Sequence, residues 1–310
     1  MSLNAAHNHN TSLQDRQGLK RLASYASIGV CVILILSKAF AFFLTGSVAI
    51  LSSLLDSLMD AVASGIALAG VLHAQKPADR GHRYGHGKAE ALAALAQTAL
   101  ITASAVLLAA ASVSHLLDPQ PLAHEWAGIG VMVLSIVLTC GLLVVQRHVI
   151  RKTESLAVDA DHVHYSGDLL MNLGVMASLA LSLFTDWTWI DPLFGLAASA
   201  YMLAAIGKVG RRSLDVLMDH ELPPQDRQQI KDIVKGHPMA RGIHDIRTRS
   251  AGDRVFIEFH LELDPDLTLA RAHDLAHEVE DLLKAAFPHA DIIIHQEPAG
   301  IDDPRMDLPH

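Results

Sequence analysis

The sequence predicts an α-helical membrane protein with six transmembrane helices, followed by a small cytoplasmic α+β domain. Hydrophobic residues make up 51% of the 310 residues and charged residues only 18%, a composition that places part of the chain in lipid. The apolar residues are concentrated before residue 218 and the charged residues after it. Six apolar segments in the first region reach the roughly 20 residues that a helix needs to cross the hydrocarbon core. Two regions of different kind therefore follow one another along the chain.

Turn and capping signals separate the predicted spans. Thr45 and Gly46 are the whole connection between the first and second spans, which predicts a tight hairpin. Asp191 and Pro192 suit the N-cap and N1 positions of the last span. The six spans are predicted at about residues 22–44, 47–72, 89–117, 126–150, 156–184 and 191–210.

Two features of the first two spans concern packing and the membrane interface. In the second span, Ala61, Gly65 and Ala69 recur at a spacing typical of close helix packing in membranes. Lys38 falls near the outer end of the first span, and we expect its ammonium to extend to the interface.

Lys and Arg residues predict the orientation of the spans, because they gather in cytoplasmic connections. They lie before the first span, between the second and third, between the fourth and fifth, and after the sixth. The alternate connections near residues 45, 118–125 and 185–190 carry none. Both termini are therefore expected in the cytoplasm. Residues 1–20 are predicted as a polar tail, since they hold no apolar stretch that could form a secretory signal peptide.

The region after the spans predicts a small folded domain. A helix is expected over 223–236, and residues 255–263 alternate apolar and polar as a half-buried strand does. An amphipathic helix is expected over 268–287 and a last strand over 291–297. The predicted organisation is a tail at 1–20, a transmembrane domain at 21–218, a cytoplasmic domain at 219–298 and a disordered tail at 299–310.

Charge and cysteine content exclude some classes of function. The net charge of −9 leaves no basic face for nucleic acid, so nucleic acid is not an expected partner. Cys31 and Cys140 both lie in apolar stretches, which indicates neither a disulfide framework nor a cysteine-based zinc site. Histidine is abundant, with 19 residues, and it is a common ligand of borderline metals.

Four ionisable residues fall inside two predicted spans, Asp56 and Asp60 in the second and His164 and Asp168 in the fifth. The members of each pair are four residues apart, so each pair projects from one helix face. With a rise of about 1.5 Å per residue, Asp56 lies level with Asp168 and Asp60 with His164, near the middle of the bilayer. Three carboxylates and one imidazole suit four-coordinate Zn²⁺. The alternative is a proton relay or a buried polar network of the same residues.

Asp161 lies about one turn before His164 in the fifth predicted span, nearer the cytoplasm. Two interpretations remain open for it: its side chain lines an entry path for the ion, or it lies at a solvated helix end.

The loop between the second and third spans has three further ligand types within eight residues. Asp79, His82 and His86 could close on one Zn²⁺, and a solvated loop is the alternative. Gly85 and Gly87 are expected to give this loop backbone freedom. In the cytoplasmic domain, His260 projects from the polar face of its strand, while His295 and Glu297 share one face of theirs. Such surface histidines are ordinarily only solvated.

These motifs together resemble the cation diffusion facilitator family. The resemblance is carried by Ser47–Asp60, by the loop Asp79–Glu90 and by Asp161–Asp168, and it extends over residues 15–298. It is strongest to the bacterial ferrous-iron/zinc efflux pumps. It implies a homodimeric metal/proton antiporter of the bacterial inner membrane, with six helices and a metallochaperone-like cytoplasmic domain.

The resemblance also implies roles for particular residues. Asp56, Asp60, His164 and Asp168 match the transport site, and Asp79, His82 and His86 match a second metal site. His244, His260, His273, His295 and Glu297 match a binuclear site near the dimer interface, although Glu297 stands where the most similar relatives have Asp. Lys88 and Asp219 match a charge interlock between membrane and cytoplasmic parts, against the alternative of an ordinary interfacial lysine and a helix-end aspartate. His7, His9 and His277 match no family ligand and are expected to be solvated.

The predicted function is efflux of a divalent metal cation in exchange for protons. Zn²⁺ is expected both as cargo and as a structural ion, and Cd²⁺ or Fe²⁺ would also suit these ligands. The alternative is a membrane-bound zinc sensor or receptor without transport. A membrane hydrolase is disfavoured, because four protein ligands would fill the coordination position that a catalytic zinc keeps open.

Overall fold

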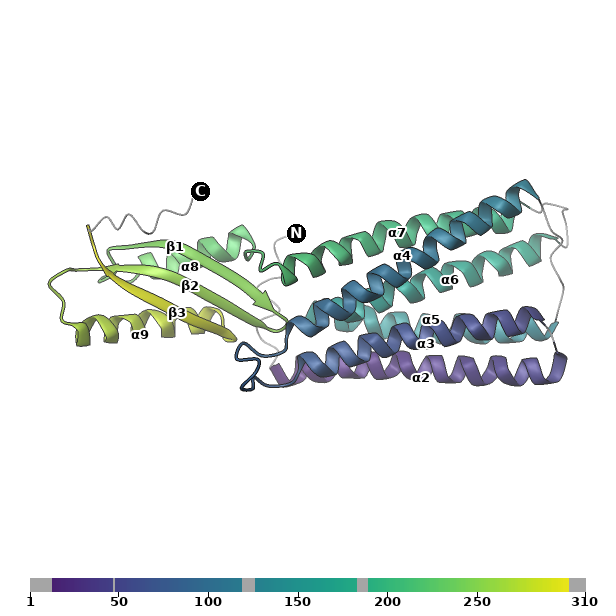
Figure 1. Cartoon of the computed structure of the whole chain (residues 1–310), viewed down its shortest axis with the longest axis horizontal. Coiled ribbons are helices and arrows are strands. Elements are labelled where there is room, and N and C mark those ends of the chain that lie inside the picture. Colours follow the sequence, from purple (N-terminus) through teal and green to yellow (C-terminus); the bar gives the residue numbers. More distant parts are fainter. Residues whose placement is uncertain (1–12, 47, 119–125, 183–188, 301–310) are drawn as a thin grey trace. The chain divides into compact units, whose positions relative to one another are not determined.

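The computed structural model describes residues 13–46, 48–118, 126–182 and 189–300 (Figure 1). The chain divides into a helical unit within Thr11–Leu214 and a second unit built from Asp215 onward. The helical unit contains α2 (Leu13–Thr45), α3 (Val48–Ala74), α4 (Lys88–Leu117), α5 (Trp126–Thr153), α6 (Leu156–Ser182) and most of α7 (Ile190–Leu217).

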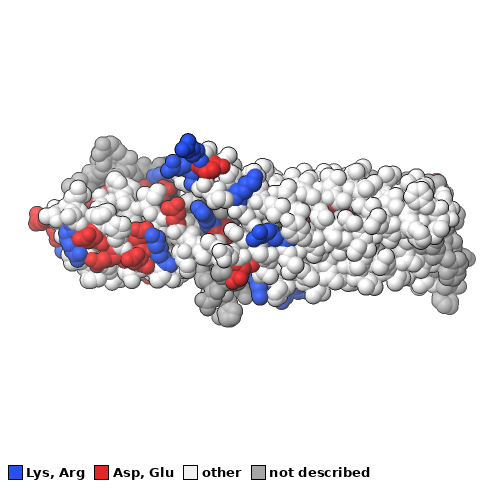
Figure 2. Space-filling model, turned by 90° about the horizontal axis from the view of Figure 1, so that it is seen from below, with Lys and Arg blue, Asp and Glu red and all other residues white. Residues whose placement is uncertain are grey.

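Six long helices therefore lie where six spans are predicted. Five of them, α2, α3, α4, α5 and α7, are long and apolar enough to cross a membrane. Helix α6 falls outside that group because acidic and histidine side chains, among them Asp161, His164 and Asp168, interrupt its first half. The sixth crossing therefore stays a prediction. On the face seen in Figure 2, charged side chains are scarce over most of the helical unit, as a lipid-facing surface requires.

The helices pack in pairs that do not simply follow chain order. Helix α2 packs against both α3 and α5, while α6 packs against α5, α4 and α3. Helices α3 and α6, which carry the predicted midplane residues, are therefore direct neighbours. This contact brings together side chains about 100 positions apart in the sequence.

The closest contact of α3 with a neighbouring helix lies outside the predicted set of small residues. Ala69 is exposed, and a Cβ placed on Gly65 would meet nothing within 4 Å. The tight contact is at Gly70, where an added Cβ would lie 2.3 Å from the Cβ of Ala93 on α4. Ala61 packs against a buried cluster of α2, α5 and α6, and close packing at Gly65 and Ala69 stays a prediction, because spacing alone does not say which face of the helix meets its neighbour.

The second unit contains α8 (Pro224–Lys235), β1 (Gly242–Ala251), β2 (Arg254–Leu263), α9 (Leu269–Ala286) and β3 (Ala290–Pro298). Its three strands lie in the order β1-β2-β3, with β1 antiparallel and β3 parallel to β2. The alternating face of β2 is confirmed, since Ile257, Phe259 and Leu261 are all fully or almost fully buried. They form a core with apolar side chains of α8 and α9.

Strand β1 was not expected from the sequence. A register shift lies between His244 and Arg247, and Asp245 there has a positive φ of 44°. As a result Ile243 and Ile246 both pack against the core although they are three residues apart. This irregularity breaks the period of two by which a strand is recognised.

The close contact between α3 and α4 gives a prediction about packing. Gly70→Ala should lower the stability of the helical unit by about 1–3 kcal/mol, because its Cβ overlaps Ala93. Gly65→Ala is the matched control on the same helix and should leave the apparent melting temperature in detergent unchanged or slightly raised. Equal melting temperatures for the two variants would contradict the packing described here.

Candidate metal sites

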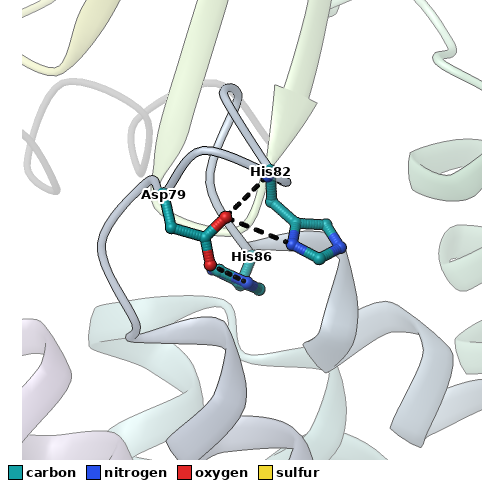
Figure 3. Close-up of side chains that lie close together, drawn as sticks. All are labelled: Asp79, His82 and His86. Atoms are coloured by element: carbon teal, nitrogen blue, oxygen red, sulfur yellow. Dashed lines mark hydrogen bonds and ion pairs between the residues drawn. The ribbon is translucent and has the colours of Figure 1, made fainter.

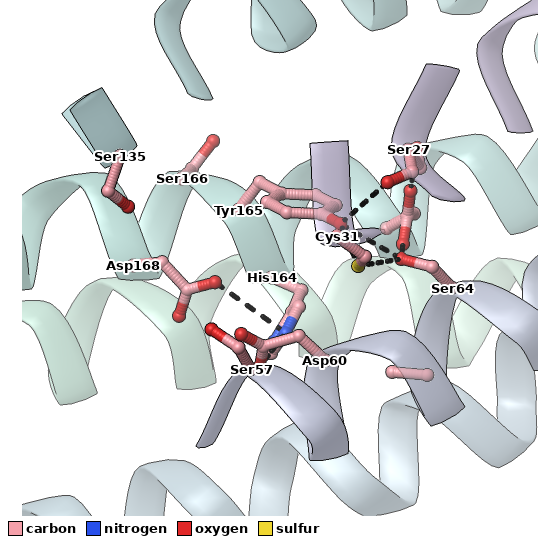
Figure 4. A network of polar contacts seen from close by, with 12 residues as sticks. Ser27, Cys31, Ser57, Asp60, Ser64, Ser135, His164, Tyr165, Ser166 and Asp168 are labelled. Carbon is pink, nitrogen blue, oxygen red and sulfur yellow. Dashed lines mark hydrogen bonds and ion pairs between the residues drawn. The ribbon is translucent and has the colours of Figure 1, made fainter. Parts of the chain in front are cut away.

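Three of the four predicted midplane residues meet between α3 and α6 (Figure 4). The Nε2 of His164 lies 2.9 Å from an Oδ1 of Asp60 on α3 and 3.6 Å from an Oδ2 of Asp168, one turn further along α6. Ligand atoms of the three residues all lie within 4.8 Å of one another. The predicted depth match between Asp60 and His164 is confirmed. One nitrogen and two carboxylate groups thus face a common point.

Asp56 lies outside this close set. It is exposed in the single chain, one turn before Asp60 on α3. Its role as fourth ligand stays a prediction. The spacing of four residues puts both aspartates on one side of the helix, but it does not make both carboxylates point to the same ion.

Asp161 is not at a solvated helix end, because its exposed fraction is only 2%. Its carboxylate accepts hydrogen bonds from Ser27 on α2 at 2.5 Å, Ser64 on α3 at 2.9 Å and Gln146 on α5 at 2.8 Å. The hydroxyl of Tyr165 lies 3.1 Å from that of Ser64 and extends the network (Figure 4). Four helices are therefore joined through one carboxylate. No pattern within one segment could have revealed this, since each partner comes from a different helix.

Lys38 also departs from its prediction. It is buried, with 9% exposed, and its Nζ donates to the backbone oxygen of Ser53 at 3.0 Å and to Oγ of Ser57 at 2.6 Å. The expectation that it extends to the membrane interface is therefore wrong. The tight hairpin between α2 and α3 brings these polar groups within reach of the lysine.

The cytoplasmic loop brings its three predicted ligands together (Figure 3). The two carboxylate oxygens of Asp79 divide between the histidines, with Oδ1 3.4 Å from Nδ1 of His82 and Oδ2 3.4 Å from Nε2 of His86. The backbone amides of His82 and Gly81 donate to the same carboxylate, and these bonds lower its pKa below the usual value. The carboxylate is thus held ionised, as a metal ligand must be.

Of the two loop glycines, one has the expected backbone role. Gly85 has a φ of +82°, which side-chain-bearing residues rarely adopt. Gly87 has a φ of −54° and needs no such freedom, so the expectation for Gly87 is wrong.

The second unit aligns three of its predicted ligands across the sheet. His244, His260 and His295 are direct neighbours on β1, β2 and β3. The carboxylate of Glu297 lies 3.2 Å from Nε2 of His244 and 3.4 Å from Nε2 of His295. His244, His260 and Glu297 form a set whose ligand atoms lie within 4.8 Å of one another.

One contact in this set is unusually close. The Nδ1 of His260 and the Oε1 of Glu297 are 2.5 Å apart, yet neither forms a hydrogen bond with any residue the structure describes. Both atoms are buried. Two ligands of one tetrahedral zinc ion lie about 3.3 Å apart, so this contact is shorter than a shared ion allows and the two atoms would have to separate to bind one.

Sequence reasoning missed two acidic residues beside this set. Glu262 accepts from Nδ1 of His244 at 2.9 Å, which leaves the Nε2 lone pair free to bind a metal. Asp245 lies 3.6 Å from Nε2 of His260 and is brought there by the irregular turn of β1. The position of Glu262, two residues after His260 on the same strand face, could have indicated the first.

His273 lies apart from that set within one chain. It is exposed on α9, where its Nε2 lies 3.2 Å from Nε2 of His277. The Nδ1 of His277 in turn lies 3.1 Å from Glu280. The fold of one chain therefore does not bring His273 to its predicted place in the binuclear site.

Three remaining predictions are not tested by the geometry. Lys88 and Asp219 belong to different units, so their interlock stays a prediction. Within its own unit, Asp219 lies 3.5 Å from Arg249. His7 and His9 lie outside the described residues.

Both units match known family models. Residues 24–218 match a model described as the cation efflux transmembrane domain, and residues 222–299 match one described as the cytoplasmic domain of cation efflux proteins. The boundary between the matches agrees with the composition change at residue 218. The two models together account for most of the chain.

Similar curated proteins match over nearly their full length. A protein named cation-efflux pump FieF from Shewanella oneidensis is 44% identical over 282 residues, which cover 91% of this chain and 95% of that protein. A protein of the same name from Klebsiella pneumoniae subsp. pneumoniae is 42% identical over 288 residues, covering 92% and 96%.

Solved structures match over about a quarter of the chain. One titled "Mode of Action of a Putative Zinc Transporter CzrB" is 40% identical, covers 26% of this chain and 99% of its own, and has a TM-score of 0.25. The metal-bound C-terminal domain of the CzcD transporter from Thermotoga maritima is 25% identical, covers 26% and 93%, and has a TM-score of 0.25.

The buried network at Asp161 gives a prediction about stability. Asp161→Ala should destabilise the helical unit by about 2–5 kcal/mol, because buried donors on α2, α3 and α5 lose their acceptor. Asp159→Ala is the control on the same helix, where an exposed ion pair with Arg212 is worth at most about 1 kcal/mol. Thermal unfolding in detergent compares the two. A loss at Asp161 no larger than at Asp159 would contradict a joining role.

Proposed function

The chain belongs to the cation diffusion facilitator family of divalent cation efflux pumps, and from this premise we propose that it exports Zn²⁺ in exchange for protons. It is a multi-pass membrane transporter and not a catalytic enzyme. The cargo we assign is Zn²⁺, with Cd²⁺ or Fe²⁺ as further substrates that the same ligand types can hold.

One observation carries the proposal. A buried imidazole, that of His164, lies within 3.6 Å of two carboxylates that come from two different helices of the membrane unit. Ionisable groups in a membrane interior are costly and mark the path of an ion. Nitrogen together with carboxylate oxygen favours zinc over the harder cations Mg²⁺ and Ca²⁺. Asp56 is the proposed fourth ligand, since tetrahedral Zn²⁺ needs one more and Asp56 is one turn away.

The ligands also explain the proposed exchange for protons. Zn²⁺ reaches the site from the cytoplasm and exchanges hydration water for Asp60, His164 and Asp168. A histidine or carboxylate must be deprotonated to bind the metal, so protons arriving from the outer side compete with it. This competition releases the cation and couples export to the proton gradient. Alternating access around the site then requires α3 and α6 to change their exposure together.

The membrane arrangement proposed here has six crossings, with both termini cytoplasmic and the bacterial inner membrane as location. Helix α6 is the sixth crossing, because its polar first half faces other helices. Asp161, Val163 and Tyr165 are all buried within the unit. A polar helix half enclosed by protein needs no contact with lipid.

For the second unit we propose a structural and regulatory zinc site in a homodimer. His244, His260 and Glu297 provide the first ligands, since their ligand atoms lie within 4.8 Å of one another. His295 lies beside Glu297 and adds a further nitrogen. His273 joins this site only from a second copy of the chain, because it is exposed and apart from the set in its own chain. Metal bound by two copies would stabilise the dimer.

The alternative function is a zinc sensor without transport. Both functions predict zinc binding, and only a transporter predicts flux that depends on the midplane residues. The loop site at Asp79, His82 and His86 fits either function, since it needs only to bind zinc.

The transport site gives the central prediction. In proteoliposomes with an imposed pH gradient, Asp60→Ala should reduce Zn²⁺ flux to the level of empty liposomes, because the site loses a carboxylate that contacts His164. Asp191→Asn, which alters a carboxylate at the start of α7, is the control and should transport normally. If Asp60→Ala transported Zn²⁺ as fast as the wild type, the assignment of this site would be wrong. If the wild-type protein itself showed no proton-coupled flux, the sensor function would be favoured.

The second unit gives a separate prediction. Glu297→Gln in the full chain should lower the number of zinc ions bound and weaken the dimer, because its carboxylate contacts all three histidines of the sheet. Glu297→Asp should retain zinc binding. Glu258→Gln, which changes a carboxylate on the polar face of β2, should leave zinc binding unchanged. Metal content and molar mass in solution measure both effects. Unchanged zinc content in Glu297→Gln would contradict the assignment.

A further inference from the structure

Lys38 is a buried cation in the membrane unit to which the proposed function assigns no role. It lies within α2, about two turns before the end of that helix at Thr45, and only 9% of its surface is exposed. Its two hydrogen bonds go to Ser53 and Ser57 on α3, and both acceptors are uncharged. A lysine kept in such surroundings is costly unless a negative charge lies close by.

The negative charge is that of the proposed transport site. Ser57, to which Lys38 donates at 2.6 Å, directly follows Asp56 and is three residues before Asp60. Burial disfavours the charged form of Lys38, and the carboxylates of Asp60, Asp168 and Asp56 favour it. Lys38 is therefore next to the site without being one of its ligands.

The net charge of the metal-loaded site indicates a role for Lys38. The three carboxylates together carry one more negative charge than a divalent cation neutralises, and His164 must be neutral to act as a ligand. The ammonium of Lys38 supplies the missing positive charge. A loaded site with Lys38 beside it is then electrically neutral, which is the least costly state in a membrane interior.

We propose that Lys38 is the fixed counter-charge of the transport site and limits how tightly the site holds a divalent cation. This inference rests on the proposed function. A fixed positive charge repels a cation, so it weakens binding, most strongly for cations of higher charge. Release during transport requires such a limit, since a cation that binds too tightly does not leave.

A purely structural role makes a different prediction. Lys38 also ties α2 to α3, and loss of a tie alone would lower stability and flux without strengthening metal binding. The affinity for Zn²⁺ and the separation of KM from kcat distinguish the two roles. Lys38→Met keeps the length of the side chain and removes its charge, whereas Lys38→Arg keeps the charge.

The experiment measures Zn²⁺ transport in proteoliposomes and Zn²⁺ binding to the full chain in detergent. The part of the binding that is lost in Asp60→Ala is assigned to the transport site. In Lys38→Met we expect the KM and the dissociation constant to fall about tenfold or more and kcat to fall as well. Lys38→Arg should restore values close to the wild type. Lys38→Gln, which retains a donor for Ser53 and Ser57, is the second neutral variant should Lys38→Met not fold.

The outcomes separate this inference from the proposed function. Unchanged or weaker binding in a folded neutral variant, with Asp60→Ala still abolishing the assigned component, would overturn the role of Lys38 and leave the transport site intact. Wild-type binding and flux in Asp60→Ala would overturn both. Failure of Lys38→Arg to restore release would show that geometry and not charge matters, and would also overturn the inference.

Discussion

A low-dielectric interior tolerates ionisable groups only when they are paired, hydrogen-bonded or bound to an ion. The helical unit obeys this constraint at each of its buried polar clusters. Asp161 is surrounded by donors from three neighbouring helices, and His164 contacts two carboxylates. Lys38 is tied to α3. The arrangement of α2, α3, α5 and α6 depends on these pairings, since apolar packing alone specifies helix positions weakly in lipid.

The clusters at Asp161 and at His164 are neighbours on α6 but differ in what they leave free. Donors from three helices satisfy the carboxylate of Asp161, so it offers little to a passing cation. At His164, by contrast, the partners are the carboxylates of Asp60 and Asp168, which we propose as metal ligands, and its Nδ1 finds no partner among the described residues. A fully hydrogen-bonded network can hold the helices rigidly around the site, while a neighbouring cluster with free ligand atoms can bind and release an ion. Transport of an ion requires both.

The three metal-binding sets share one ligand chemistry at three levels of exposure. Each combines histidine with carboxylate, which suits zinc, and none of these three sets contains cysteine. The loop set is largely exposed, the set on the sheet is half-buried, and the membrane set has a buried histidine. Exposure governs how easily water and protons compete for the ligands. The same ligand chemistry therefore meets water and protons to a different degree in each set.

Composition and periodicity were enough to predict the six long helices, the strand β2 and the boundary near residue 218, because burial in lipid and burial in a small core impose strong local patterns. The spacing of Asp60, His164 and Asp168 also predicted their meeting, since a helix converts sequence distance into depth. Strand β1 was hidden by its irregular register. The surroundings of Lys38 and Asp161 depended on neighbours from other helices, and His273 lies apart from its predicted site within one chain. What a residue contacts across helices is decided by packing, and no single segment of the sequence encodes it.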